Sequence, residues 1–263
     1  MNNNTYWFEA RGVDSYKNGY QVIKNLNIKF KLNESVIILG PNGSGKSSLV
    51  DLINRNLYPV EKENKILKIF DKELIDIWEL RAKISTVNNE IKNRISPNIT
   101  VIDLIISGLY GCYCKVNNSN KGDLKLVNNL ITSMSLQNIA EKEFFCLSDG
   151  EKQFALIARA IIKNPIVLIL DEPTINLDLK SQIFLIDKIQ KLTKTGISIL
   201  CITHDINLIN KKFNRVIFLK NRKIVEDGRP YQIINSKNIN HLFDVNIKLK
   251  ENDNGWDILR WNL

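Results

Sequence analysis

Residues 35–48 read SVIILGPNGSGKSS and join an apolar run to a glycine-rich loop. The β-branched run at residues 35–39 predicts a strand, and SLVDLINRN at residues 48–56 predicts a helix. Between them, GPNGSGKS at residues 40–47 satisfies the pattern G-x-x-x-x-G-K-[ST] in the strand-to-helix context that the pattern requires. A glycine-rich turn without a ligand is the alternative, but the flanking strand and helix favour a phosphate-binding loop.

The residue types of this loop suit a nucleoside triphosphate. Glycines let the backbone curl so that successive N–H groups point toward phosphate oxygens, and the start of the following helix adds its dipole. Lys46 would neutralise charge on the β- and γ-phosphates, and the Ser47 hydroxyl would coordinate Mg²⁺. The sequence therefore predicts a site for a nucleoside triphosphate and Mg²⁺.

Two further apolar runs end in residues that suit phosphate chemistry. IVLIL at residues 166–170 precedes Asp171 and Glu172. LCIT at residues 200–203 precedes His204. Asp171 could hold Mg²⁺, and Glu172 could act as a general base because neighbouring strand side chains point in opposite directions. The alternative for Asp171 and Glu172 is that they only form the polar end of a strand. For His204 the alternative is a structural role, which is commoner for a lone histidine than a catalytic role.

The stretch CLSDGEKQFALIARA, residues 146–160, predicts an amphipathic helix with an unusual start. Ser148 and Glu151 form the S-x-x-E pattern of a capping box, in which each side chain satisfies the other's backbone N–H. The same pattern allows either a capped core helix or a helix N terminus presented to a ligand. A charge on Asp149 would be unfavourable beside a triphosphate, so we expect this side chain to point toward Lys152 or solvent.

Apolar runs that alternate with helical patterns indicate a parallel α/β core. Residues 5–35 read as an N-terminal β subdomain, and RVIFLKNRKIVEDGRP at residues 215–230 predicts a hairpin. Residues 85–160 read as an inserted α-helical subdomain, and residues 245–263 as a C-terminal tail. We therefore predict an α/β phosphate-loop core with an antiparallel β subdomain and a helical insertion, in a single domain over residues 1–263.

The bulk composition narrows the function classes. A length of 263 residues suits one large domain, and the net charge of +9 is spread over scattered Lys and Arg residues, which favours a solvated surface over a nucleic-acid site. The four cysteines and two histidines lack the spacing of a zinc site, so reduced thiols in a cytosolic protein are expected. The apolar runs are too short to span a bilayer, so any membrane role would act through a partner.

Five motifs together resemble one family. GPNGSGKSS, LSDGEKQ, LILDEP, NLD and ITHD occur in the order and approximate spacing of the ATP-binding-cassette (ABC) ATPases, and the resemblance covers roughly residues 8–245. ITVIDLIISGLYG at residues 99–111 also resembles the helical subdomain of ATPases that serve iron-chelate and molybdate-type importers. The chain is therefore identified as resembling the ATP-binding subunit of an ABC transporter.

The resemblance implies roles for matching residues, with ATP and Mg²⁺ as ligands. The implied nucleotide-binding residues are Tyr16, Gly40, Pro41, Asn42, Gly43, Ser44, Gly45, Lys46, Ser47, Ser48, Ser148, Gly150 and Asp178. The implied catalytic residues are Glu172, His204 and Lys46, and the implied metal ligands are Ser47, Asp171 and Asn89. Tyr16 stands where the family stacks an aromatic residue on adenine, with Tyr20 as the alternative. Ser148 and Gly150 would contact the γ-phosphate of ATP bound to a partner chain.

Two departures from the family pattern stand out. The family's Q-loop glutamine is missing near ISTVNNEI, residues 84–91, where Asn89 or a neighbour takes its place. Asparagine keeps the amide but is one methylene shorter, which puts direct Mg²⁺ or water contact in doubt. The second departure is the signature itself, which usually reads L-S-G-G-Q and here reads L-S-D-G-E.

The resemblance implies a cytoplasmic ATPase that lies on the inner face of the membrane and powers uptake through a separate permease. One phosphate loop and one signature per chain imply a head-to-tail dimer, expected to be a homodimer, and the system would include a periplasmic or extracellular binding protein. Nucleic acid is not expected as a partner. The alternatives are a soluble ABC ATPase that acts on ribosomes or nucleic acid, and a regulatory ABC module with low turnover.

Overall fold

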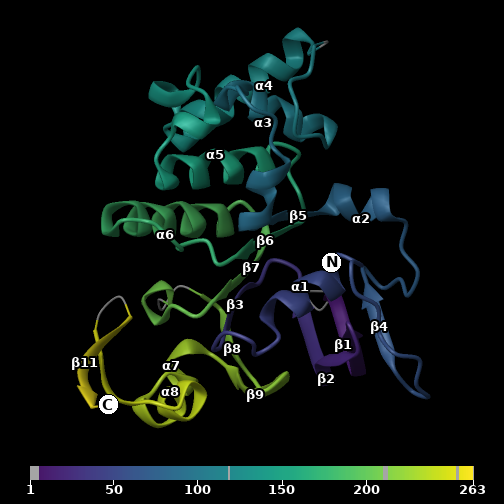
Figure 1. Ribbon diagram of the computed structural model, residues 1–263, viewed down its shortest axis with the longest axis vertical. Coiled ribbons are helices and arrows are strands. Elements are labelled where there is room, and N and C mark those ends of the chain that lie inside the picture. The colour runs from purple at the N-terminus through teal and green to yellow at the C-terminus, as the bar shows by residue number, and fades with distance from the viewer. Residues whose placement is uncertain (1–5, 118, 210–212, 253–254, 263) are drawn as a thin grey trace. The chain divides into compact units, whose positions relative to one another are not determined.

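The computed structural model describes residues 6–117, 119–209, 213–252 and 255–262. The chain divides into two compact units (Figure 1). The first unit combines Met1–Arg81 with Ser198–Leu263, and the second is Ala82–Ile197. The first unit is therefore discontinuous in sequence, and the second is inserted into it.

An antiparallel sheet in the first unit has the strand order β2-β1-β4. Its strands are β1 (Tyr6–Lys17), β2 (Tyr20–Lys31) and β4 (Ile66–Ile69). Aromatic packing stabilises this sheet, since the rings of Trp7 and Phe30 stack with centroids 5.3 Å apart and both side chains are buried. The antiparallel β portion predicted from the N-terminal residues is thus present, and β4 joins it from later in the chain.

A second sheet in the first unit places the phosphate loop. Strand β3 (Ser35–Leu39) pairs in parallel with both β7 (Ser198–Thr203) and β8 (Arg215–Lys220). Strand β9 (Lys223–Gly228) then pairs antiparallel with β8. All residues of β3 and β7 are buried, as the continuous apolar runs predict for parallel strands covered on both faces. The predicted hairpin and the mixed sheet are confirmed.

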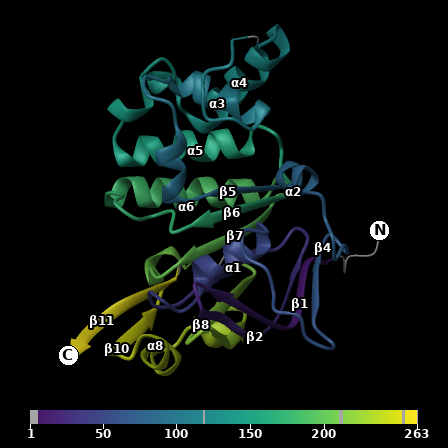
Figure 2. The ribbon, with the colours of Figure 1, turned by 45° about the vertical axis from the view of Figure 1, so that its right-hand side comes forward.

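Helix α1 (Lys46–Ile53) follows β3 through the phosphate loop. The C-terminal part of the same unit contains α7 (Pro230–Ile233), α8 (Ser236–Phe243), β10 (Asn246–Glu251) and β11 (Trp256–Asn262), after a short 3-10 turn at Ile206–Leu208. Strands β10 and β11 form an antiparallel pair beside α8 (Figure 2). The sequence of residues 245–263 predicts only a tail, so the strand pair is not predicted.

The second unit is mainly helical (Figure 1). Its helices are α3 (Val101–Tyr110), α4 (Lys121–Met134), α5 (Asp149–Ile161) and α6 (Leu179–Thr193), with 3-10 turns at Asn89–Arg94, Gln137–Ile139 and Phe144–Cys146. Helix α2 (Ile77–Lys83) runs across the boundary of the two units. Strands β5 (Ile84–Val87) and β6 (Val167–Asp171) pair in parallel. Gly108 lets α3 approach α5, because a Cβ there would lie 2.4 Å from the Arg159 carbonyl oxygen.

Candidate nucleotide-binding site

The phosphate loop joins β3 to α1 and is held by its own lysine. Lys46 is 6% exposed, and its Nζ donates to the carbonyl oxygens of Gly40 at 2.7 Å and Pro41 at 3.0 Å. The ammonium group therefore lies inside the loop, where a bound phosphate would also lie. A buried cation at a helix N terminus makes the loop a strong anion site, because the exposed N–H groups of the helix point the same way.

Glycine is required at two positions of this loop. Gly45 has φ 106°, a left-handed conformation that L side chains rarely adopt, and a Cβ there would lie 2.9 Å from the Val22 carbonyl oxygen. A Cβ at Gly40 would lie 2.2 Å from the Leu219 carbonyl oxygen. The loop is thus packed against two other strands of its unit, and its shape depends on the absence of side chains.

The serines of the loop suit a phosphate and its metal. Ser44 is buried, and its Oγ has no hydrogen-bond partner among the described residues. A buried hydroxyl without a partner is costly, and a ligand oxygen would satisfy it. Ser47 is exposed in the first turn of α1, and Ser48 is half-buried beside it. The donor set of the loop therefore fits a triphosphate, with Ser47 accessible for Mg²⁺.

The turn between β8 and β9 also supports the loop, which no sequence motif predicts. The Arg222 N–H donates to the Ser44 carbonyl oxygen at 3.0 Å, and the Arg222 carbonyl oxygen accepts from the Lys24 N–H at 3.1 Å. Arg222 has φ 66°, so the turn holds a non-glycine residue in a left-handed conformation. In the sequence, only the pair Asn221-Arg222 between two apolar runs indicates a turn at this position.

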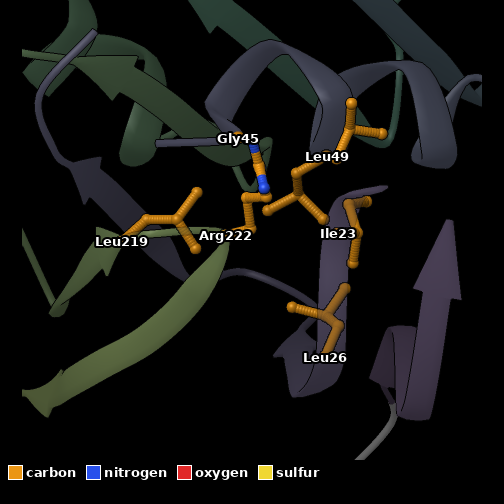
Figure 3. A pocket seen from close by; sticks show the side chains of 7 residues that line it. Ile23, Leu26, Gly45, Leu49, Leu219 and Arg222 are labelled. Carbon is orange, nitrogen blue, oxygen red and sulfur yellow. The ribbon is translucent and has the colours of Figure 1, made fainter. Parts of the chain in front are cut away.

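A small apolar pocket lies beneath the loop (Figure 3). Ile23, Leu26, Leu49 and Leu219 line it, and Gly45 and Arg222 close it on the side of the loop. These side chains come from β2, α1 and β8, so the pocket marks the place where three elements converge under the phosphate loop. Its lining is too apolar to suggest a phosphate ligand of its own.

Both tyrosines that the adenine prediction names lie at the β1–β2 turn. Tyr16 is 51% exposed and pairs with Gln21, whereas Tyr20 is 74% exposed and pairs with Lys17. An ion pair of 3.0 Å between Lys17 and Asp51 joins this turn to α1. The exposed ring of Tyr16 thus belongs to the same part of the unit as the phosphate loop.

His204 follows β7 at the edge of the sheet where the phosphate loop follows β3. Strands β3 and β7 are parallel neighbours with Leu39 opposite Thr203, and the Gly40 N–H donates to the Thr203 carbonyl oxygen at 3.3 Å. His204 is exposed. The structure therefore brings His204 to the start of the phosphate loop, as parallel pairing of the two strands requires.

The two predicted acids lie where strand β6 ends in the second unit. Asp171 is the last residue of β6, and Glu172 has φ 51°. This left-handed conformation is uncommon for a residue with a long side chain and costs roughly 1–3 kcal/mol. The sharp change of backbone direction gives Glu172 an orientation that the simple alternation of a strand would not give. Strained backbone of this kind is concentrated at functional sites.

The LSDG stretch forms the predicted capping box at the start of α5. Ser148 Oγ accepts from the Glu151 N–H at 3.3 Å, and a Glu151 Oε2 oxygen accepts from the Ser148 N–H at 2.9 Å. The Ser148 hydroxyl also donates to the same carboxylate at 2.7 Å. These hydrogen bonds from Ser148 lower the pKa of Glu151 below its ordinary value. The capping-box prediction is confirmed.

Asp149 and Gly150 have surroundings that the sequence does not reveal. The Asp149 carboxylate lies 4.0 Å from Lys92 Nζ, so its cation is Lys92 in the Asn89–Arg94 turn and not the expected Lys152. The Asp149 side chain is still 46% exposed, in line with the expected access to solvent. Gly150 is buried, and a Cβ there would lie 2.5 Å from Ser181 Oγ in α6.

Asp178 and Asn89 both lie at the starts of helical segments. Asp178 caps α6 by accepting from the Ser181 N–H at 2.7 Å, and this hydrogen bonding lowers the pKa of Asp178. Asn89 is exposed at the first position of its 3-10 turn. The amide oxygen of neighbouring Asn88 caps that turn by accepting from the Ile91 N–H at 3.2 Å. Of these two asparagines, Asn89 has the more accessible side chain.

The mixed sheet and the glycine-rich loop with its buried lysine define a P-loop nucleotide-binding protein. A model of the ABC transporter family matches residues 23–175, which is more than half of the chain. The chain belongs to the ABC transporter family and is an ATP-binding subunit of that family. Cassettes of this family bind and hydrolyse ATP, and the chain is an ATPase.

Three similar proteins cover most of the chain. An uncharacterized ABC transporter ATP-binding protein of Methanocaldococcus jannaschii is 31% identical over 230 residues, which cover 86% of this chain and 77% of the relative. The petrobactin import ATP-binding protein YclP of Bacillus subtilis is 28% identical over 249 residues, which cover 94% and 96%. A dimeric post-hydrolysis structure of an ATP-binding cassette with ADP and Pi has a TM-score of 0.71 and 28% identity, and the match covers 84% of this chain and 98% of that one.

Within the described ranges, no helix is both long enough and apolar enough to cross a membrane.

Proposed function

We propose that this chain hydrolyses ATP to drive uptake of a substrate through a separate transmembrane permease. The observation that carries the proposal is a complete phosphate loop on a chain that matches nearly the full length of a petrobactin import ATP-binding protein. The chain would lie in the cytoplasm, peripheral to the inner face of the membrane, and a binding protein on the outer side would deliver the substrate. The single domain over residues 1–263 would contain the N-terminal β subdomain (5–35), the helical insertion (85–160) and the tail (245–263).

The active form in this proposal is a head-to-tail homodimer. The chain holds one phosphate loop and one LSDG helix start, so two chains complete two sites. The similar cassette that was solved as a dimer with ADP and Pi supports this arrangement. Ser148 and Gly150 of one chain would then face the γ-phosphate of ATP held by the other chain.

Each predicted residue has a distinct task in the proposed reaction. Lys46 would exchange its bonds with the loop carbonyls for bonds with the β- and γ-phosphates. His204 would contact the γ-phosphate, and Glu172 would accept a proton from the attacking water. Tyr16 would stack on the adenine ring and Asp178 would contact the ligand from the α6 start. Magnesium would supply charge neutralisation to the phosphates.

The residues proposed for Mg²⁺ are Ser47, Asp171 and Asn89. Hydroxyl, carboxylate and amide oxygens are the protein ligands that Mg²⁺ accepts, and Mg²⁺ usually takes only one or two of them beside water and phosphate oxygens. The exposed hydroxyl of Ser47 at the start of α1 therefore fits the metal best. Asn89 is exposed but short, so its contact would pass through a water molecule.

Affinity purification from native membranes tests the permease partner. The tagged chain is extracted with a mild detergent, and an untagged strain supplies the control. We expect a polytopic membrane protein to co-purify in stoichiometric amount with the tagged chain alone. Recovery with ribosomes or nucleic acid and without a membrane protein would contradict the proposal.

Steady-state turnover separates an importer subunit from a regulatory module. The purified chain and its complex with the co-purified membrane protein are compared at saturating ATP. An importer subunit should hydrolyse ATP faster in the complex, and transported substrate should be coupled to that rate. Equal and negligible rates in both samples would instead favour the regulatory module with low turnover.

A further inference from the structure

Two cysteines of the second unit stand one residue apart where the chain bends after α3. Gly111 ends α3 in a left-handed conformation, and the chain bends at Tyr113 and Cys114. Cys112 is half-buried and Cys114 is exposed, and both are free thiols. The Cys112 Sγ lies 3.6 Å from the Cys114 carbonyl oxygen. Both sulfurs are thus accessible to a small reagent, and they belong to one short loop.

The two thiols interact. The Cys112 thiol donates to the Cys114 carbonyl oxygen, and interaction with the Cys112 side chain raises the pKa of Cys114. A thiolate next to a second thiol is the arrangement in which a mixed disulfide is resolved within the chain, because the thiolate is the attacking species and its partner is already in contact.

We propose that Cys112 and Cys114 form a reversible thiol-modification site for low-molecular-weight disulfides of the glutathione class. The Cys112 thiolate attacks one sulfur of the small disulfide, whose S–S bond breaks as a mixed disulfide forms and a first small thiolate leaves. Cys114 then gives up its proton to solvent, and its thiolate attacks the Cys112 sulfur and displaces the second small thiolate. The two displaced thiolates take up the two protons lost by the cysteines, so the chain is oxidised by two electrons and the reagent is reduced to two thiols.

The residue between the cysteines connects this site to α5. The Arg159 guanidinium lies 3.8 Å from the centroid of the Tyr113 ring, and its Nη2 donates to the Cys112 carbonyl oxygen at 2.6 Å. Its Nε donates to Ser107 Oγ at 3.3 Å in α3. The Tyr113 carbonyl oxygen accepts from the Ser96 N–H at 3.0 Å. Tyr113 thus joins α5, whose start is the LSDG stretch, to the segment after Asn89–Arg94.

Disulfide closure would change this connection. A disulfide fixes the dihedral angle about its S–S bond, so closing one between residues only two apart would constrain the backbone at Tyr113 between them. The Cys112 carbonyl oxygen and the Tyr113 ring both contact Arg159, so a constraint on this loop would act on both contacts. We therefore expect the end of α5 to lose part of its anchoring in the oxidised chain, and its amide hydrogens to exchange faster.

Cys146 offers a matched control within the same unit. It is exposed, as Cys114 is, but it has no neighbouring cysteine in the chain. Cys201 is buried in β7. A Cys146→Ser variant therefore leaves the Cys112–Cys114 pair as the accessible thiols and keeps all residues assigned to nucleotide binding.

Intact-mass spectrometry after incubation with oxidised glutathione tests the proposal. The full-length Cys146→Ser chain should lose two hydrogen atoms and retain no glutathione, and dithiothreitol should restore the original mass. Peptide mapping should place the new bond between Cys112 and Cys114. Adding Cys114→Ser to this background should instead leave one glutathione on Cys112. A Cys146→Ala chain is the control for the introduced serine, and it should give the same masses as the Cys146→Ser chain after the same treatment.

Several results would overturn the proposal. Retention of two glutathione molecules by the Cys146→Ser chain would show that the two sulfurs cannot reach each other. Thiols that react only after a metal chelator is added would show that the pair holds a metal ion instead. Loss of helical circular dichroism on oxidation would show that the bond forms in unfolded chains. These readouts do not require ATP turnover, so they remain decisive if the transport proposal fails.

Hydrogen exchange tests the connection to α5. In the folded, oxidised Cys146→Ser chain, amides near Arg159 should exchange several-fold faster than in the reduced chain, whereas those of α1 should be unchanged. Equal exchange in both forms would show that the modification stays local to the loop. An Arg159→Lys variant should show the faster exchange even when reduced, because lysine lacks the planar fork that spans the Cys112 carbonyl and the Tyr113 ring.

Discussion

The phosphate loop and the LSDG helix start are both helix N termini suited to phosphate, but they satisfy their donors differently. The phosphate loop has a left-handed Gly45 at the N-cap position and no side-chain cap, and its buried Lys46 is held by loop carbonyls. The LSDG start is closed by Ser148 and Glu151, which use each other's donors. The first is therefore open to a ligand as it stands.

The second site must exchange bonds to take a ligand. Ser148 donates its hydroxyl proton to Glu151 and its N–H to the same carboxylate, so a phosphate oxygen would compete with a carboxylate that is already in place. We infer why one chain contains both an open phosphate loop and a capped LSDG helix start. The open loop can bind ATP in a single chain, whereas the capped helix is stable without ligand and needs a second chain to become a binding group.

Glu172→Gln should have the largest effect on ATP turnover, because it removes the proposed base. It changes neither the phosphate loop nor the LSDG helix start. Turnover should fall by roughly 10²–10⁴-fold while ATP affinity is kept. ATP-bound dimers should then accumulate, which size-exclusion chromatography with Mg²⁺ and ATP would detect. Undiminished hydrolysis would contradict the assignment of Glu172.

Lys46→Ala should have the next largest effect and should act on the open region alone. Loss of a charge-assisted hydrogen bond costs about 1.5–3 kcal/mol, which corresponds to ATP binding that is weaker by a factor between roughly 10 and 160. Binding of a fluorescent ATP analogue to the single chain measures this loss. The capping box of α5 should be unaffected, so the thermal unfolding of the nucleotide-free chain controls for a general loss of structure. Unchanged affinity would show that Lys46 only supports the loop.

Ser148→Ala should affect the dimer and leave nucleotide binding by the single chain intact. Removal of a helix cap costs about 1 kcal/mol of stability. The ATP-driven dimer should weaken by more than that cap explains, because the same hydroxyl would face the partner's γ-phosphate. Glu151→Gln is the matched control, since glutamine also completes a capping box. Glu151→Gln should therefore leave the dimer intact, and a Ser148→Ala dimer that weakens by no more than the loss of unfolding free energy would show that Ser148 acts only as a cap.

The motifs predict the parallel core and the position of the loop because they depend on local backbone chemistry. Gly45 must be glycine for its φ of 106°, and a sequence pattern can record such a requirement. The strand pairing that brings His204 beside Gly40 follows from two apolar runs and from the right-handed crossover connections of parallel sheets. These features could therefore be read from residues that are close together in sequence.

Other features depend on contacts between distant segments and could not be predicted. Arg222 reaches Ser44 through a turn that lies far along the chain, and no periodicity announces it. Lys92 pairs with Asp149 although Lys152 is much nearer in sequence. The left-handed conformation of Glu172 is likewise not signalled by the spacing of residues around it. Such contacts are set by packing and not by spacing.

The pH dependence of stability offers a smaller test of the closed region. The folded-state pKa of Glu151 is lowered by its bonds from Ser148, so the ionised group stabilises the fold. This contribution is full above the unfolded pKa of about 4.3 and is lost as pH falls through the lowered folded pKa. The wild-type chain should therefore lose its advantage over Glu151→Gln only in acid, as measured by urea unfolding at pH 7 and below pH 4. A constant difference across that range would contradict the ionised capping box.

Asp149→Asn should have the smallest effect and distinguishes shape from charge at the LSDG start. Asparagine keeps a residue that tolerates the helix start, but it removes the charge that pairs with Lys92. A partly exposed ion pair contributes about 0–1 kcal/mol, so the unfolding midpoint in urea should barely move. The ATP-driven dimer should be as strong or stronger, because a negative charge near the partner's triphosphate has been removed. Sedimentation with ATP in the Glu172→Gln background measures the dimer, and a clear weakening would show that Asp149 itself contributes to dimerisation. Lys92→Met would then show whether this contribution depends on the ion pair.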